Sequence, residues 1–253
     1  MKIPTSTSCS SAASPLKTDP QGGAPRCGAP YLWHSHRMDP SYDIRPGLHF
    51  CRFESEYVFL DLPAGRYFLI QGRTSQAFAH FLDQRASDDE QAVLLDQQLI
   101  GPAGGLAIGN LPLPPAVTAS LIDQPLPDTP RLDTLRAIAA QRRARFDIGR
   151  IPVFEITRRM GERLEKHSPE SRQETYIRVA AAFHRARRYA LATDRCLERG
   201  IAMRRILARA RCDARLVFGV TLPFAAHCWV QAGEAVLTDP LDVILRYKPI
   251  LAV

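Results

Sequence analysis

Three stretches near the C-terminal end decide the fold: T-D-R-C-L-E-R-G at residues 193–200, F-A-A-H-C-W-V at residues 224–230 and L-T-D-P at residues 237–240. They supply one cysteine, one histidine and one aspartate, in that order. A thiol becomes a good nucleophile when a base takes its proton, and the base works best when a third group orients it. We therefore predict that Cys196, His227 and Asp239 form a catalytic triad.

Cys196 is predicted to lie at the start of a helix. Thr193 or Asp194 suits the N-cap position, which places Cys196 in the first turn of C-L-E-R-G-I-A-M-R-R-I-L-A-R-A. The positive end of the helix dipole and the free backbone N–H groups there favour the thiolate. The alternative, a buried structural cysteine, stays open on position alone.

A β-hairpin is predicted to bring His227 to Asp239. Residues 214–222, 224–232 and 234–240 have strand patterns, and Gly233-Glu234 suits a two-residue type II′ turn. If Ala232 pairs with Ala235, His227 lies opposite position 240, one residue from Asp239. Asp242 is the fallback for the third member of the triad.

The strand alternation also separates two neighbouring side chains. His227, Trp229 and Gln231 are predicted to share one face of their strand, with Cys228 on the other. Cys212 precedes a strand and has no helix terminus to activate it, so neither of these cysteines is the predicted nucleophile.

The region 48–110 is predicted to be a small winged-helix-like module. L-H-F-C-R-F, Y-V-F-L-D-L and R-Y-F-L-I-Q predict three short antiparallel strands within residues 48–72. One helix is expected to start at Thr74 or Ser75, and another at Ser87, where Glu90 completes a capping box and Gly101 ends the helix. Residues 102–110 fit a small wing or a loop. The sheet edge could accept an extended peptide as an added strand, and DNA binding or dimerisation are alternatives.

The chain divides into four predicted parts of an α+β protein. Residues 1–45 are a disordered tail rich in Ser, Thr, Pro and Gly, and Met38 is a hypothetical start site that N-terminal sequencing would test. Residues 46–110 form the small module, and residues 111–131, with six prolines, form a linker. Residues 132–253 form the second domain. Its first two helices are expected to bury Leu132, Leu135, Ile138, Ala139 and Phe146, and then Tyr176, Val179, Ala180, Phe183 and Tyr189.

The charge and the cysteine content limit which classes of function are possible. The net charge is +7, and residues 131–215 hold 22 Lys and Arg against 10 Asp and Glu, so nucleic-acid binding must be considered beside solvated arginine faces on helices. None of the six cysteines forms a C-x-x-C pair, His34 and His36 lack a third ligand, and no metal or cofactor is expected. No long apolar run or secretory signal is present, so the cytoplasm is the expected location.

The C-terminal pattern resembles a known family. A helix-borne Cys196, then G-V-x-L-P-F-x-A-H-x-W-V, then Asp239 and the terminal Y-K-P-I-L resemble the transglutaminase-like (papain-like) cysteine peptidase domain of lasso peptide maturation B proteins. Cys228 and Gln231 stand where Ala and Glu are expected. The resemblance covers about residues 131–253. The matching residues of the central motif are Gly219, Val220, Pro223, Phe224, His227, Trp229 and Val230.

The resemblance implies a function and partners. Members of this family remove the leader from microcin-type precursor peptides, and residues 48–110 weakly resemble the PqqD-like module that binds the leader. The implied partners are therefore a precursor peptide and an ATP-dependent, asparagine-synthetase-like macrolactam cyclase. Two alternatives stay open: acyl transfer to an amine by the same triad, and a non-enzymatic winged-helix regulator that binds nucleic acid.

Overall fold

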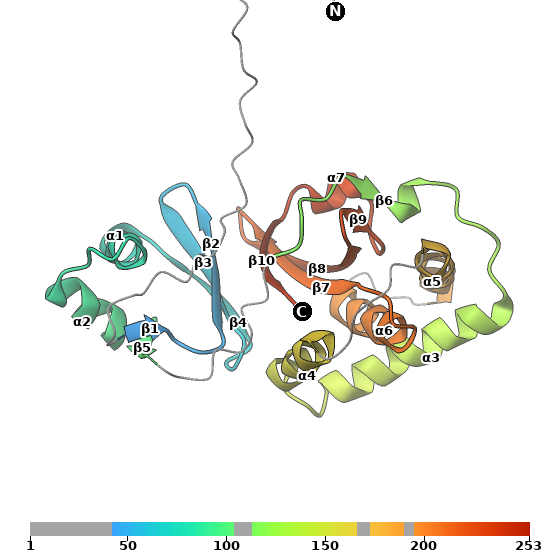
Figure 1. The fold of residues 1–253 in the computed structure, drawn as a ribbon, viewed down its shortest axis with the longest axis horizontal. Helices are drawn as coiled ribbons and strands as arrows, with labels where there is room; N and C mark the ends of the chain where they lie inside the picture. Colours follow the sequence, from blue (N-terminus) through green and yellow to red (C-terminus); the bar gives the residue numbers. More distant parts are fainter. Residues whose placement is uncertain (1–41, 104–112, 166–172, 190–194) are drawn as a thin grey trace, which may run out of the picture. The chain divides into compact units, whose positions relative to one another are not determined.

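The computed structural model describes residues 42–103, 113–165, 173–189 and 195–253, and these form a mixed helix and sheet (α+β) fold (Figure 1). Three sheets are present in these ranges: a two-stranded sheet β1-β5, a three-stranded sheet β2-β3-β4 and a five-stranded sheet β10-β7-β8-β9-β6. None of the helices in these ranges is long and apolar enough to cross a membrane.

The three strands predicted within residues 48–72 are confirmed. The middle strand, β3, is buried from its second residue onward, which explains its continuous apolar run. Its side chains alternate between two cores: Tyr57 and Phe59 pack with Phe78, whereas Val58 and Leu60 join the core of the C-terminal half. The bounds are β2 (Leu48–Phe53), β3 (Glu56–Asp61) and β4 (Arg66–Ile70).

The helix α1 (Gly72–Leu82) begins earlier than predicted, with Gln71 at its N-cap. The two predicted caps are engaged elsewhere, because the Thr74 hydroxyl accepts from the Gln97 amide at 3.1 Å and the Ser75 hydroxyl donates to the Ser55 carbonyl. A side chain that serves a distant partner does not cap its own helix, so the cap prediction was wrong here.

The helix α2 (Asp88–Asp96) confirms the capping box of Ser87 and Glu90 but ends before Gly101. Gln98 adopts a positive φ of 56°, which breaks the helix and lets the chain turn into β5 (Ile100–Pro102). β5 pairs with β1 (Tyr42–Ile44), which falls inside the predicted disordered tail.

The five-stranded sheet positions the candidate site. Ala232 pairs with Ala235 as predicted. Gly233 has a φ of +55° and Glu234 keeps a negative φ, which fits the type II′ turn. The third predicted strand is much shorter than residues 234–240. The bounds are β7 (Arg215–Thr221), β8 (Ala225–Ala232), β9 (Ala235–Val236) and β10 (Lys248–Ala252).

The proline-rich stretch predicted as a linker also contributes to this sheet. Its β6 (Ala119–Ser120) pairs in parallel with β9 and is followed by the 3-10 turn η1 (Leu121–Asp123). The Gln231 amide donates to the Pro115 carbonyl at 2.7 Å, which ties the stretch to β8. Prolines suit such an edge because they lack the N–H that a central strand would need.

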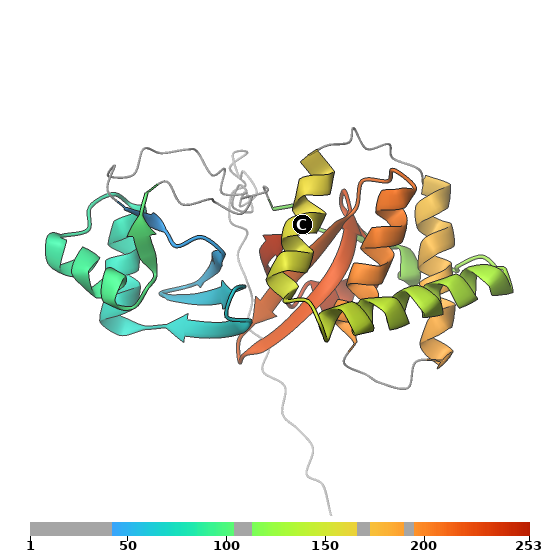
Figure 2. The same ribbon diagram turned by 90° about the horizontal axis from the view of Figure 1, so that it is seen from below.

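Helices cover both faces of the sheet. α3 (Arg131–Ile148) and α4 (Val153–Glu165) gather with α5 (Gln173–Ala186) and α6 (Cys196–Arg209) on one side, whereas α7 (Leu241–Ile244) lies on the other (Figure 1). α3 packs across α5 and α6 (Figure 2). A 3-10 turn, η2 (Arg187–Tyr189), follows α5.

The predicted core face of α3 was wrong except at Ile138, which is half-buried against the core. Leu132, Leu135 and Phe146 are 56%, 61% and 48% exposed, whereas the side with Thr134, Ala137, Ala144 and Asp147 is buried. Small residues let the crossing helices approach closely, and Asp147 accepts from Arg205 at 2.6 Å. In the next helical segment the predicted core residues are buried except Tyr189, which lies in η2 and is 65% exposed.

Candidate active site

Cys196 is the first residue of α6, as the sequence predicts. The N-cap is Arg195, which makes no side-chain cap, and the predicted caps Thr193 and Asp194 lie outside the described residues. Gly200, one turn further along, brings this end of the helix onto the sheet, since a Cβ there would lie 2.5 Å from Leu216 Cδ1. The helix N-terminus therefore holds Cys196 against the strands.

Cys228 and His227 are the two residues that most favour ionisation of the Cys196 thiol. The pKa of Cys196 is lowered to about 4. The hydrogen bond from the Cys228 thiol contributes most to this shift, whereas burial opposes it. The hydrogen bond and the charge of His227 lower the pKa further. Cys196 is therefore a thiolate at neutral pH, which is the form that attacks carbonyl groups.

His227 lies on β8 opposite Gly219 of β7. A Cβ at Gly219 would come within 2.6 Å of Trp229 Cζ3 and 3.1 Å of Tyr247 Cβ, so the glycine makes room for these two side chains. The ring centroids of Tyr247 and His227 are 5.3 Å apart. Gly219 thus makes room for Trp229 and for Tyr247, and the ring of Tyr247 lies beside the imidazole.

The charge of His227 is stabilised by its partners. Burial lowers the pKa of His227, but the hydrogen bonds to Asp239 and Cys196 outweigh burial and raise that pKa to about 9. Between about pH 4 and about pH 9 the site therefore contains a Cys196 thiolate beside a His227 imidazolium.

Asp239 completes the arrangement. The distance from His227 Nε2 to Asp239 Oδ2 is 3.4 Å, which is at the long end for a hydrogen bond. Both atoms are buried, and within the described residues neither has a partner in hydrogen-bond geometry, so the 3.4 Å contact is an ion pair in which each atom is the other's nearest opposite charge. Asp239 Oδ1 accepts from Arg199 Nη2 at 2.8 Å and from Arg187 Nη2 at 3.0 Å.

These contacts keep Asp239 ionised. Burial raises the pKa of Asp239, whereas the His227 hydrogen bond and the Arg199 charge lower it more, to about 2. The main-chain carbonyl of Asp239 also accepts from the Ser120 hydroxyl at 2.7 Å. A buried carboxylate needs such partners, because an unpaired charge in the interior is costly.

The short length of β9 affects the edge of β8 at which Cys196, His227 and Asp239 meet. Val230 N–H donates to Thr238 Oγ1, so it points away from β7, and strand alternation directs the N–H of Cys228 to the same side. Within the described residues β9 pairs only with the last two residues of β8, so no strand pairs with this edge at His227 and Cys228. Cys196 and Asp239 approach the strand there.

The structure thus brings the three predicted residues together and separates the alternatives from them. Asp242 is exposed and lies 3.9 Å from Arg246 at its nearest side-chain atoms. Cys212 is buried and its thiol donates to the Ala210 carbonyl at 3.7 Å. In the part of the chain that the structure describes, no three His, Cys, Asp or Glu side chains form a group that could hold a metal ion.

Three residues of the site were not found by reading the sequence: Arg187, Arg199 and Cys228. Arg199 had a usable signal, because it follows Cys196 by three residues and therefore lies on the same side of the helix. Arg187 had none, since its link to Asp239 joins distant segments. Cys228 was placed on the opposite strand face from His227, and only the packing of α6 on β8 brings its sulfur near that helix.

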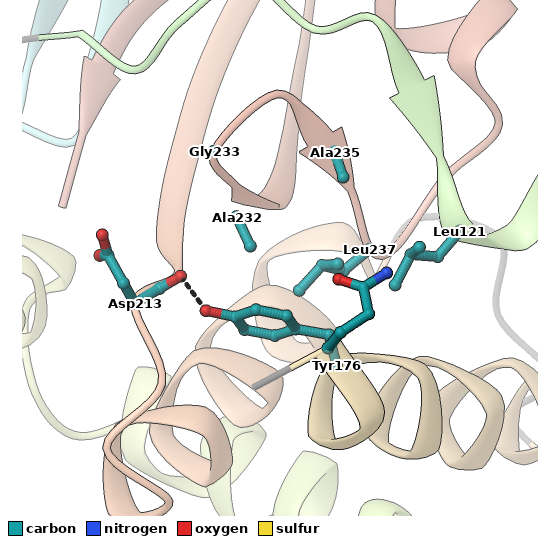
Figure 3. Close-up of a pocket in the computed structure, with 8 residues that line it drawn as sticks. Leu121, Tyr176, Asp213, Ala232, Gly233, Ala235 and Leu237 are labelled. Carbon is teal, nitrogen blue, oxygen red and sulfur yellow. Dashed lines mark hydrogen bonds between the residues drawn. The ribbon is translucent and has the colours of Figure 1, made fainter. Parts of the chain in front are cut away.

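A cavity of about 220 Å³ lies elsewhere in the C-terminal half (Figure 3). Tyr176, Leu121 and Leu237 line it, and Tyr176 Oη donates to the Asp213 carbonyl at 2.6 Å. Cys196, His227 and Asp239 are not among its lining residues, so this cavity is separate from the candidate active site.

Comparison with known families identifies the class of the C-terminal half. Residues 138–252 match the transglutaminase-like superfamily, so this part of the chain is a transglutaminase-like domain. Proteins of that superfamily include cysteine peptidases and transglutaminases. Comparison with curated proteins and with solved structures returned no match.

Proposed function

We propose that this protein is a leader peptidase of lasso peptide maturation. The observation that carries the proposal is the Cys196–His227–Asp239 arrangement at the start of α6, within a transglutaminase-like domain. A thiolate, an imidazolium and a carboxylate in series are the groups that cysteine peptidases use to cleave amide bonds. The resemblance of the motif around His227 supports the choice of substrate class.

The cleavage proceeds in two steps. The Cys196 thiolate attacks the carbonyl carbon at the leader–core junction, and His227 gives its proton to the leaving amine of the core, which leaves a thioester on Cys196. His227, now neutral, takes a proton from water, the hydroxide displaces the sulfur, and the leader departs with a free carboxylate. Asp239 holds the imidazole ring and stabilises its charged form throughout.

Stabilisation of the developing oxyanion is assigned to the backbone at the start of α6. The N–H of Cys196 is an N-terminal helix donor without an intrahelical acceptor. Preorganised donors of this kind lower the barrier because they do not reorient during the reaction.

We assign capture of the leader to β4, an outer strand of the three-stranded sheet. No strand within the described ranges pairs with its far edge, so its backbone groups are free to accept an extended peptide. Tyr67 of β4 lies 5.6 Å, ring to ring, from Phe224 on the turn before β8. Burial raises the pKa of Tyr67, and the negative charge of the Cys196 thiolate adds to this effect. A peptide added to β4 would therefore lie close to the thiolate.

The arginine-rich half gives less support to nucleic-acid binding. Many of its guanidinium groups are already paired with carboxylates, such as Arg158 and Arg159 with Glu155, and Arg205 with Asp147. Paired charges contribute less to a positive surface than the composition suggests.

The test uses the purified chain, its cognate precursor peptide and mass spectrometry of the products. We expect a leader with a free carboxylate and a separate core, and no cleavage by Cys196→Ala, which should still bind the leader. Cleavage by the alanine variant would show that Cys196 is not the nucleophile. A leader joined to an added amine would instead identify acyl transfer, and salt-sensitive DNA binding without cleavage would identify the regulator.

A further inference from the structure

The proline-rich segment at residues 113–124 contacts Asp239 directly. Ser120, the last residue of β6, is 4% exposed, and its hydroxyl donates to the main-chain carbonyl of Asp239 at 2.7 Å. Asp239 is itself 5% exposed, so both partners are shielded from water. The hydrogen bond joins residues that are 119 positions apart, and it therefore holds Asp239 from outside the hairpin that brings it to His227.

A second side chain of the segment holds the main chain just beyond Asp239. Asp123 Oδ2 accepts from the N–H of Leu241, the first residue of α7, at 3.0 Å. Pro240 lies between the two contacts and has no N–H of its own. Side chains from one segment thus hold the peptide groups on both sides of Pro240, which restricts the backbone that carries the Asp239 carboxylate.

The segment can act as a fixed support because it is anchored away from Asp239. Its strand β6 pairs in parallel with β9 (Figure 1), and the Pro115 carbonyl accepts from the Gln231 amide at 2.7 Å. Gln231 is 2% exposed and also donates to the Gly233 carbonyl at 2.8 Å. These contacts tie the segment to the end of β8 and to the turn that follows, so Ser120 is presented from a part of the chain that is itself held in place.

The position of the Asp239 main chain matters because the carboxylate makes a contact with little tolerance. Asp239 Oδ2 lies 3.4 Å from His227 Nε2, which is at the long end for a polar contact. The attraction between opposite charges falls as they separate. A small displacement of the main chain would therefore weaken the pairing, and the hydrogen bond from Ser120 restricts such a displacement.

We propose that Ser120 is a positioning residue, which holds the main chain of Asp239 so that its carboxylate stays paired with His227. The inference rests on the proposed function only in that His227 and Asp239 serve the same reaction as Cys196. The segment predicted as a linker then also supports the candidate active site.

The first test needs no substrate. The full chain with isotope-labelled histidine is titrated by NMR, and the signal of His227 is identified by its absence in His227→Gln. Burial lowers the pKa of His227, but its contacts with Asp239 and Cys196 raise that pKa to about 9. Ser120→Ala loosens the carboxylate from the imidazole, so this pKa should fall by about one unit. Ser120→Thr keeps a hydroxyl donor and should stay near the wild type.

Steady-state cleavage of the precursor peptide gives the second readout. Loss of one hydrogen bond between neutral groups corresponds to a fall in kcat of about 5- to 10-fold in Ser120→Ala. KM should change little, because a side chain that is 4% exposed offers no surface to the substrate.

Controls separate positioning from a general effect on the segment. Thr118 lies two residues away, and its hydroxyl donates to the exposed Glu234 carboxylate at 2.9 Å. Thr118→Val removes that hydroxyl with little change in shape, and it should leave both the pKa of His227 and kcat unchanged. Thermal melting monitored by circular dichroism shows which variants fold. If Ser120→Ala does not fold, Ser120→Cys keeps the shape with a weak donor and should lower the pKa and kcat in the same direction.

Two outcomes would overturn the inference: an unshifted pKa of His227 in Ser120→Ala, or an equal fall in Ser120→Ala and Thr118→Val. Its failure is distinct from failure of the proposed function. If the wild type cleaves no precursor, the peptidase assignment is rejected, whereas the titration still tests Ser120. If the wild type cleaves the precursor and Ser120→Ala leaves the pKa and kcat unchanged, only the role of Ser120 is rejected.

Discussion

Arg199 Nη2 and Asp239 Oδ1 are 2.8 Å apart, and this contact joins the helix that carries Cys196 to the carboxylate that faces His227. The Arg199 side chain is 14% exposed and that of Asp239 is 7% exposed, so the pair is largely shielded from water. The Arg199 guanidinium thus links α6 to the carboxylate directly, and Arg187 is a second donor to the same oxygen.

Replacing Arg199 should lower turnover. Arg199→Gln removes the charge that anchors Asp239, and loss of one hydrogen bond between charged groups corresponds to a fall of about 10- to 100-fold in kcat. The measurement is steady-state cleavage, with KM expected to change little because no substrate contact is removed. Arg205→Gln is the matched control, since Arg205 is on the same helix but pairs with Asp147. Equal losses in both variants would indicate a general effect on α6.

The pH dependence of kcat/KM should be bell-shaped with a broad plateau. Below about pH 4 the Cys196 thiolate is protonated, and above about pH 9 His227 loses the proton that the leaving amine needs. Activity therefore falls as pH drops through the lower value and as it rises through the upper one. A profile with a single limb near the ordinary pKa of a free thiol would contradict the ion pair.

Asp239→Asn should narrow that plateau from the alkaline side. The carboxylate raises the pKa of His227, and removal of an opposite charge at this range shifts a pKa by about one to three units. The alkaline limb should thus move to lower pH while the acid limb moves little. The same pH series of kcat/KM on the variant checks this. An alkaline limb that stays near its original pH would show that Asp239 does not stabilise the protonated form of His227.

Gly219→Ala should destabilise the fold and displace the side chains of Trp229 and Tyr247. The added Cβ would meet Trp229 Cζ3 at 2.6 Å, and such overpacking costs about 1–3 kcal/mol. Chemical denaturation measures the free energy of unfolding. Gly101→Ala is the control, since a Cβ there meets nothing within 4 Å. If Gly219→Ala were as stable and as active as the wild type, the room that Gly219 leaves for Trp229 and Tyr247 would not be required.

Much of the local structure could be predicted because it depends on neighbours in the chain. The capping box at Ser87, the turn at Gly233 and the start of α6 at Cys196 involve residues a few positions apart, and all three are present. The three strands within residues 48–72 follow from alternation over short segments. The roles of the triad residues stay predictions that the proposed experiments test.

The predictions that were wrong depended on what packs against what. Leu132, Leu135 and Phe146 of α3 are exposed. Apolar periodicity alone therefore does not determine which face of a helix is buried when small residues allow closer packing on the other face. Thr74 and Ser75 do not cap α1 because their hydroxyls serve partners 23 and 20 residues away.

By itself, the sequence determined the order of the elements and the three residue types of the candidate site, since helix starts, strand alternation and hairpin register are set by short-range geometry. Only the tertiary structure decided what surrounds those residues. Arg187 and Arg199 reach Asp239 across 52 and 40 positions, and the sulfur of Cys228 lies near Gly200 because α6 packs on β8. Contacts between distant segments depend on how whole elements pack, which no local pattern encodes.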